Sequence, residues 1–270
     1  MYKIGLIGAQ NSHAEHFADA FNGKKLYGDS RAACIFGDDH PQKAAELSER
    51  YSLKNCDSLS ELLDNCDAVV ITYRKGSQHY YTAMKALNAG KAAFIDKPFT
   101  TDYSQAVEIC NYARKNNLLI CGGTNLKGVS GLPKVKENIC SGSTAVISFS
   151  ADCASEYEGY HFYGSHSVEI CLELFGLDYR GVTAKKNGET IIVTVTYKTG
   201  QCIFINAPDT DGLKITLFNK GNVKHFDIPM DYENVGSTEL VTMLETGAPP
   251  RDYDFYTTAV KLTQEIVEKL

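Results

Sequence analysis

The first 122 residues alternate short apolar runs with longer segments of helical period, and this alternation constrains the fold more than any other feature. The apolar runs have the length of strands and lie at 2–7, 32–36, 67–72, 92–95 and 118–121. Segments with a helical pattern separate them, at 12–21, 41–51, 56–63, 79–89 and 101–115. Strands that are each followed by a helix form a parallel sheet with helices on both faces. We therefore predict an α/β fold whose N-terminal domain, 1–122, is a Rossmann-type, doubly wound parallel sheet.

The pattern changes after residue 122. A glycine-rich stretch, 122–131, precedes a short helix at 132–139, a strand at 145–152 and a helix at 162–175. Strands with alternating apolar residues follow at 190–197, 202–207, 213–219 and 224–228, with hairpin turns at 198–200 and 219–222. We predict a second domain, 123–270, of α+β type, with an open, mostly antiparallel sheet and a helix on one side. The final helix, 253–270, can pack within this domain or back on the first.

Composition excludes several kinds of protein. The 43% hydrophobic residues fit a globular protein, and the net charge of −6 comes without a basic block, so we expect no nucleic-acid partner. The N-terminus does not resemble a signal peptide and no apolar run approaches the ~20 residues of a membrane span, so we expect a cytoplasmic protein without membrane contact. The nine cysteines form no C-x-x-C pair, and the sequence predicts no metal site.

The turn after the first strand has the context of a dinucleotide-binding fingerprint. The strand runs into Gly8, and Ser12 with Glu15 forms a capping box that opens a helix. Gln10 and His13 stand where the fingerprint carries its second and third glycines. Gly8 can make the tight turn, while the side chains of Asn11 and Ser12 can bond a phosphate. We expect the cofactor to contact this turn at Gly8, Gln10, Asn11, Ser12 and His13. The alternative is an ordinary strand–helix turn that binds nothing.

Further polar residues follow later strands of the predicted sheet. Asp38 ends the second strand, where an acid accepts hydrogen bonds from an adenosine ribose and repels a 2′-phosphate, which favours NAD over NADP. Thr72 and His79 bound a polar loop after the 67–72 strand, and Lys97 follows the 92–95 strand. Ligands gather at the carboxyl ends of strands in open α/β sheets. We therefore expect these side chains to contact the cofactor.

These motifs resemble the Gfo/Idh/MocA oxidoreductase family in order along nearly the whole chain. The family's Glu-Lys-Pro appears as Asp96-Lys97-Pro98, and its Thr-Pro-x-x-x-His loop is echoed from Thr72 to His79 without the proline. The start of its histidine-bearing helix appears as Gly164-Ser-His166-Ser-Val-Glu169. The resemblance implies NAD(P)-dependent redox chemistry on sugars or cyclitols, a cis Pro98, and a substrate bordered by Lys97 and His166. The aspartate that the family often carries four residues before the histidine is Phe162 here.

Oxidation of an alcohol needs a hydride acceptor, which the cofactor supplies, and a base for the hydroxyl proton. His166 is the expected base, Lys97 the expected point charge for the developing oxyanion, and Glu169, on the same helix face, the residue expected to orient His166. The expected substrate is a polyol or sugar derivative. Two other functions stay open: a non-catalytic dinucleotide-binding or sensor protein, and redox-neutral glycoside cleavage with bound NAD.

The predicted sheet of the second half also bears on assembly. Its strands alternate apolar residues from Ile191 to Phe226, and one helix can cover only one of its faces. A second copy of the chain could cover the other face. We therefore expect a homodimer or homotetramer that forms through this sheet.

Overall fold

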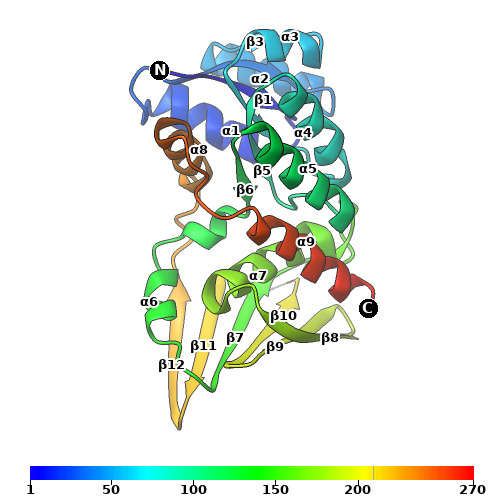
Figure 1. Cartoon of the computed structure of the whole chain (residues 1–270), viewed down its shortest axis with the longest axis vertical. Helices are drawn as coiled ribbons and strands as arrows, with labels where there is room; N and C mark the ends of the chain where they lie inside the picture. The colour runs from blue at the N-terminus through cyan, green and yellow to red at the C-terminus, as the bar shows by residue number, and fades with distance from the viewer. Residues whose placement is uncertain (209) are drawn as a thin grey trace. The chain divides into compact units, whose positions relative to one another are not determined.

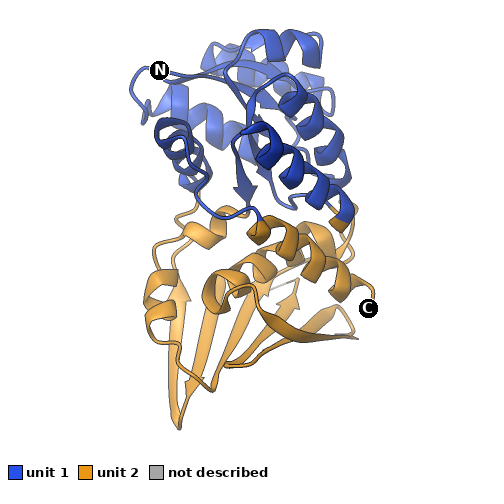
Figure 2. Ribbon diagram, viewed as in Figure 1, with its two compact units in different colours: residues 1–100, 104–123, 233–253 blue, residues 101–103, 124–232, 254–270 orange. Residues whose placement is uncertain are grey.

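The computed structural model describes residues 1–208 and 210–270, which fall into two compact units (Figure 2). Unit 1 comprises residues 1–100, 104–123 and 233–253, and unit 2 comprises 101–103, 124–232 and 254–270. The sequence predicted a single boundary at 122/123. The structure instead returns the chain to unit 1 at residue 233, and it places the final helix in unit 2.

Unit 1 contains a six-stranded parallel sheet in the order β3-β2-β1-β4-β5-β6, which confirms the predicted doubly wound fold. Its strands are β1 (Lys3–Ile7), β2 (Arg31–Phe36), β3 (Lys54–Asn55), β4 (Ala68–Ile71), β5 (Ala92–Asp96) and β6 (Ile120–Gly123). Its helices are α1 (Ser12–Ala18), the π-helical η1 (Asp19–Gly23), α2 (Pro41–Tyr51), α3 (Leu59–Asp64), η2 (Gly76–Gln78), α4 (His79–Asn88), α5 (Tyr103–Asn116) and α8 (Val235–Thr246).

Burial explains why the sequence predicted the strands of unit 1 apart from β3, whose two residues are exposed. Every residue of β4 is buried, as expected for a central strand covered by helices on both faces. Side chains of α1, α2 and α8 share one core cluster with the sheet, and α4 packs against β4 and β5 (Figure 1). The sequence did not predict α8, since Gly236 and three threonines interrupt its apolar pattern. Its tertiary contacts include a hydrogen bond of 2.8 Å from the Tyr2 hydroxyl to the Leu244 carbonyl.

Unit 2 is built on a second six-stranded sheet, in the order β12-β11-β7-β10-β9-β8 (Figure 1). β7 and β10 are parallel neighbours, and the other pairs are antiparallel. The strands are β7 (Ser143–Ser150), β8 (Tyr179–Asn187), β9 (Thr190–Tyr197), β10 (Gly200–Ala207), β11 (Leu213–Asn219) and β12 (Asn222–Ile228). Both predicted hairpins, β9–β10 and β11–β12, are confirmed. The sequence did not predict β8, in which charged residues and a register shift near Gly181 hide the alternation.

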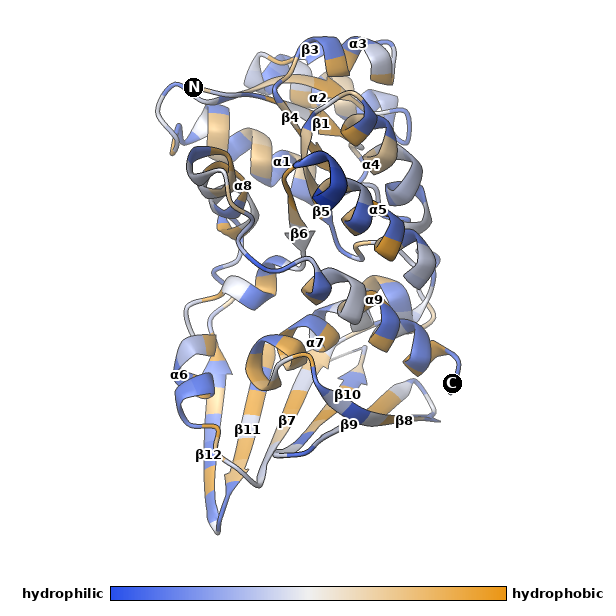
Figure 3. Cartoon of the chain, in the orientation of Figure 1, coloured by the Kyte–Doolittle hydropathy of each residue, from blue (hydrophilic) through white to orange (hydrophobic). Residues whose placement is uncertain are grey.

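The helices of unit 2 are η3 (Asn125–Gly128), α6 (Leu132–Glu137), α7 (Tyr160–Phe175) and α9 (Asp254–Val267). α7 packs on β7 and β10 and also against α9, and Figure 3 shows the apolar residues that α7, β7 and β11 contribute. β7 alternates strictly between buried and half-buried residues, so one face of the sheet is covered by α7. Within this contact the Tyr160 hydroxyl donates to Asn206 at 3.0 Å, and Asn206 donates to the Ser167 hydroxyl at 2.9 Å.

The pairing of β5 with β6 requires a glycine at position 122. Gly122 has φ +148°, and a Cβ atom there would lie 1.9 Å from the carbonyl oxygen of Ile95. We expect Gly122→Ala to lower the free energy of unfolding by more than about 3 kcal/mol, the upper end of the usual range for point substitutions. Urea denaturation measures this. Gly181→Ala is the control, because a Cβ there meets nothing within 4 Å. Equal midpoints for the two variants would contradict the prediction.

Candidate functional site

The turn after β1 is tight and lies against the end of β4. Gly8 has φ +87°, and a Cβ there would lie 2.9 Å from the backbone nitrogen of Tyr73. Its N–H donates to the Phe36 carbonyl at 2.9 Å, and the Thr72 hydroxyl donates to the Gly8 carbonyl at 3.0 Å. Gly8 is therefore required by close backbone approach. Thr72, predicted as a cofactor contact, holds this turn in place.

Two neighbouring carboxylates follow β2 and play different parts. Asp39 accepts hydrogen bonds from the N–H groups of Ala9 (2.8 Å) and Gln10 (3.2 Å), so it closes the glycine turn. Asp38 is exposed and accepts a hydrogen bond from the Tyr73 hydroxyl at 2.7 Å. Burial, together with the Asp38 carboxylate, raises the pKa of Tyr73. The sequence pointed to Asp38 as the ribose acid but gave Asp39 no part in the turn.

A buried carboxylate at the end of β5 joins the first turn of α1 to the sheet. Asp96 has no exposed surface, and its Oδ2 lies 2.6 Å from His13 Nδ1 and 3.1 Å from Asn11 Nδ2. Burial pushes the pKa of the Asp96 carboxyl upward, but the His13 imidazolium and the Lys97 ammonium outweigh it and hold that pKa at about 2. Asn11, predicted as a phosphate contact, and His13, which stands at a glycine position of the fingerprint, are thus tied to the strand that precedes Lys97.

The second oxygen of Asp96 is an unsatisfied acceptor. Asp96 Oδ1 is buried and has no hydrogen-bond partner among the residues that the structure describes. A buried carboxylate oxygen in this state is costly unless a ligand or water donates to it. A ligand rich in hydroxyl groups would supply such a donor.

Lys97 follows Asp96 directly and is 3% exposed. The Lys97–Pro98 peptide bond is cis, as the family resemblance implied. His79 supports the same loop: it is fully buried, and its ring nitrogens face the carbonyl oxygens of Pro98 (2.7 Å) and Tyr73 (2.9 Å). Burial lowers the pKa of His79. His79 therefore joins the loops after β4 and β5, a supporting part that differs from the cofactor contact expected of it.

In unit 2, α7 carries His166 and Glu169 into a second buried polar cluster. His166 is 9% exposed, and its Nδ1 lies 2.5 Å from the hydroxyl oxygen of Thr124. Glu169 is 2% exposed and accepts the N–H of Thr124 at 2.9 Å. Phe162 is buried as well, and so is every residue of α7 from Gly164 to Leu172, so α7 is buried on all sides along this stretch. Thr124 was not predicted from the sequence. The available signal was a hydroxyl residue directly after the last parallel strand.

Two further residues of η3 belong to this second cluster. Lys127 is 3% exposed, and its ammonium donates to the Thr124 carbonyl at 2.8 Å. Asn125 is also 3% exposed, and its Oδ1 has no partner among the described residues. Unit 2 therefore contains a second buried acceptor that a hydroxyl-bearing ligand could satisfy.

The described residues also bear on metal binding and on membrane insertion. Over residues 1–208 and 210–270, no group of three or more His, Cys, Asp or Glu side chains is placed to hold a metal ion. No helix in the same ranges has the length and apolar character needed to cross a bilayer.

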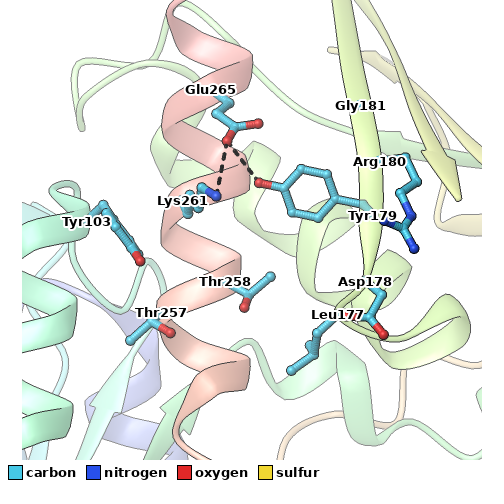
Figure 4. A pocket seen from close by; sticks show the side chains of 10 residues that line it. All are labelled: Tyr103, Leu177, Asp178, Tyr179, Arg180, Gly181, Thr257, Thr258, Lys261 and Glu265. Atoms are coloured by element: carbon cyan, nitrogen blue, oxygen red, sulfur yellow. Dashed lines mark hydrogen bonds and ion pairs between the residues drawn. The ribbon is translucent and has the colours of Figure 1, made fainter.

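Unit 2 also has a pocket of about 410 Å³ beside α9 (Figure 4). There Glu265 accepts a hydrogen bond from the Tyr179 hydroxyl at 3.0 Å and lies 3.8 Å from the Lys261 ammonium. The Lys261 ammonium and the Glu265 carboxylate are thus paired with each other. We assign no function to this pocket.

Comparison with known proteins agrees with this geometry. The model of the Gfo/Idh/MocA family, described as an oxidoreductase family with an NAD-binding Rossmann fold, matches residues 2–123. An uncharacterised oxidoreductase of Schizosaccharomyces pombe is 30% identical over 149 residues, which are 47% of this chain and 39% of that protein. UDP-N-acetylglucosamine 3-dehydrogenase of Acidithiobacillus ferrooxidans is 31% identical over 103 residues, 38% of this chain and 32% of the enzyme. The sequence matches thus span two fifths or less of these relatives.

Solved structures share the fold over the whole chain. The same Acidithiobacillus ferrooxidans enzyme superposes with a TM-score of 0.81 at 16% identity, covering 100% of this chain and 97% of the other. Apo scyllo-inositol dehydrogenase of Lactobacillus casei gives 0.83 at 13% identity, with coverages of 100% and 96%. GenD2 from gentamicin A biosynthesis, in complex with NAD, gives 0.81 at 13% identity, with coverages of 99% and 93%.

The low pKa of Asp96 predicts a pH dependence of stability. Its folded value of about 2 lies below the ordinary 3.8, so its contribution is present above pH 4 and is lost as the pH falls toward 2. The shift corresponds to about 2 kcal/mol. We expect the stability difference between wild type and Asp96→Asn, measured by urea denaturation, to shrink by about this amount from pH 5 to pH 2. Asp29→Asn, at an exposed aspartate, is the control. A difference that does not vary with pH would contradict this account.

Proposed function

We propose a function from one premise: through residues 2–123 this chain belongs to the Gfo/Idh/MocA oxidoreductase family, whose Rossmann fold binds NAD. The protein is then an NAD-dependent dehydrogenase that transfers a hydride between the nicotinamide and an alcohol carbon of a sugar-like or cyclitol substrate. The observation that carries this proposal is the buried Lys97, next to a carboxylate with an unsatisfied oxygen.

The residues of unit 1 fit a dinucleotide. Gly8 allows the turn to lie close to the sheet, and the exposed Asp38 carboxylate can accept hydrogen bonds from a ribose. Asp39 adds a second negative charge at the same turn, so a 2′-phosphate would be repelled. These features support NAD over NADP. Asn11, Ser12 and His13 would line the path of the diphosphate.

The cofactor, when bound, supplies the hydride acceptor. Side chains of the protein then bind the oxygen of the substrate and stabilise the charge that develops on it. Lys97, held in a dry environment, stabilises negative charge on that oxygen. His166 contacts that oxygen through its imidazole, which can give or accept a hydrogen bond. Glu169 acts with it through the buried cluster on Thr124.

The substrate class rests on the two unsatisfied acceptors and on the fold. Asp96 Oδ1 in unit 1 and Asn125 Oδ1 in unit 2 are buried oxygens that accept hydrogen bonds, and each by itself suits a hydroxyl group of a ligand. The solved structures that share the fold include a dehydrogenase of a nucleotide sugar and one of a cyclitol. Together these findings support a polyol or sugar derivative.

A second candidate is a dinucleotide-binding protein without turnover. One observation favours it: Asp39 already accepts the N–H groups of Ala9 and Gln10, and the side chains of Gln10 and His13 occupy two glycine positions of the fingerprint. Such a turn offers a phosphate fewer donors than a glycine loop does.

Thermal unfolding with each of NAD⁺, NADH, NADP⁺ and NADPH tests cofactor binding. A ligand at a hundred times its dissociation constant stabilises the fold by about 2.7 kcal/mol, which raises the midpoint by roughly 2–4 °C. We expect this shift with NAD⁺ and NADH and a smaller one with NADP⁺ and NADPH, and Asp38→Asn should reduce the difference. No shift with any of the four would remove the dehydrogenase proposal.

Turnover on a panel of cyclitols and nucleotide sugars then separates the two candidates. Lys97→Ala and His166→Ala should each lower kcat by about a hundredfold or more while the thermal shift with NAD⁺ stays. Binding of NAD⁺ without turnover of any substrate would favour the second candidate. Turnover by both variants at the wild-type rate would remove Lys97 and His166 from the reaction.

We also propose that the face of the unit 2 sheet opposite α7 forms the contact of a homodimer or homotetramer. Ile192, Phe218 and Val223 lie on the exposed strand faces, with 39%, 44% and 51% exposure, and Phe218 pairs with Val223 across β11 and β12. Exposed apolar residues on a sheet favour association. Phe218→Lys should convert the assembly to monomers in light scattering, whereas Leu26→Lys, at an exposed leucine of unit 1, should not. A monomeric wild type at working concentration would contradict this.

A further inference from the structure

The buried hydroxyl of Thr124 lies where it can decide which nitrogen of His166 carries a proton. Thr124 has no exposed surface, and its Oγ1 lies 2.5 Å from His166 Nδ1. We propose that Thr124 is a positioning residue that holds neutral His166 in its Nε2–H form. His166 then meets the substrate oxygen as a hydrogen-bond donor rather than as a base. This inference rests on the proposed function, in which His166 contacts that oxygen.

Donor and acceptor counting supports this tautomer. The Thr124 hydroxyl has one hydrogen and two lone pairs. One lone pair accepts the N–H of Leu126 at 3.1 Å. The structure offers the hydroxyl hydrogen one acceptor among the described residues, which is His166 Nδ1. A neutral imidazole that accepts at Nδ1 carries its hydrogen on Nε2.

The opposite tautomer would leave a hydrogen unsatisfied. If Nδ1 donated to Thr124, the oxygen would accept from both His166 and Leu126, and its own hydrogen would be buried without an acceptor among the described residues. A buried donor without a partner costs about 1–3 kcal/mol. The Nε2–H form avoids this cost.

The backbone of Thr124 is held on both sides, so the hydroxyl has a defined direction. Its N–H donates to the Glu169 carboxylate at 2.9 Å, and its carbonyl accepts from the Lys127 ammonium at 2.8 Å. Both charged side chains are nearly completely buried. Glu169 thereby acts on His166 through Thr124: its carboxylate holds the Thr124 backbone, and the Thr124 hydroxyl contacts His166 Nδ1.

The chemical consequence concerns the substrate oxygen. A hydrogen-bond donor stabilises a carbonyl oxygen as it gains negative charge during hydride addition. Neutral His166 would thus act on that oxygen as an electrophilic group while NADH adds its hydride to the carbonyl carbon, and the alkoxide that forms then takes its proton from water. The same hydrogen bond stabilises the oxyanion in either direction of the reaction, and its effect is measured here in the direction of ketone reduction.

The test replaces the hydroxyl while keeping the shape. Thr124→Val removes it, and Thr124→Ser retains it. Thr263→Val is the matched control, since Thr263 is also buried but its hydroxyl, among the described residues, bonds the carbonyl of Ala259 in its own helix, at 2.8 Å. Ring ¹⁵N NMR of histidine-labelled protein reports the tautomer, and His166→Ala assigns the His166 signals.

We expect the Nε2–H form in the wild type, Thr124→Ser and Thr263→Val, and a shift toward Nδ1–H in Thr124→Val. With NADH and a ketone substrate, kcat of Thr124→Val should fall about tenfold, as for the loss of one positioned hydrogen bond, with KM nearly unchanged. Thr124→Ser should recover most of that rate, which a merely steric defect would not predict.

Either of two results would overturn the proposal: an Nδ1–H tautomer in the wild type, or an unchanged tautomer in Thr124→Val. Failure of the proposed function gives a different pattern. The tautomer would then respond to Thr124→Val as expected, while no protein in the set would turn over any substrate.

Discussion

The structure depends on how it satisfies charged groups that are buried at the carboxyl ends of its parallel strands. A carboxylate removed from water is costly unless it is paired and hydrogen-bonded. Asp96 has no exposed surface, and its Oδ2 is hydrogen-bonded to the side chains of both His13 and Asn11. This pairing fixes the first turn of α1 to the end of β5, so it also determines the path of the backbone into Lys97. The segment that is expected to do chemistry therefore starts from a side chain that is fully buried and hydrogen-bonded to α1 and the residue before it.

The same principle accounts for the altered glycine turn. Position 13 carries a histidine where the fingerprint has its third glycine. The His13 ring is hydrogen-bonded to the buried Asp96 carboxylate. The N–H groups of Ala9 and Gln10 are satisfied by the Asp39 carboxylate. The turn thus keeps its shape through side-chain hydrogen bonds where a fingerprint relies on glycines. Loss of the motif in the sequence does not require loss of the turn in space, although it does change which groups a phosphate meets.

The parts of the molecule that could be predicted from sequence are those set by local pattern. Central strands such as β4 are continuous apolar runs, and β9 and β10 alternate buried residues with more exposed ones, so the α/β order and the hairpins followed directly. β8 and α8 were missed because their patterns are weak and their stability comes from tertiary contacts. Likewise Asp38 matches a spacing rule, whereas the use of Asp39 depends on the three-dimensional path of the turn.

Thr124 shows why a candidate site is harder to predict than a fold. Threonine after a strand has no distinctive pattern, and its meaning comes from a histidine 42 residues later and a glutamate 45 residues later. Once those contacts exist, a neutral hydroxyl controls the direction in which an imidazole can exchange a proton, without carrying charge itself. The sequence alone does not say whether His166 acts as a base or as a hydrogen-bond donor. The hydrogen-bond partner of its Nδ1 distinguishes the two roles. The residue that sets the tautomer of such a histidine is identified by counting the hydrogen-bond donors and acceptors around it. Residue type alone does not reveal it.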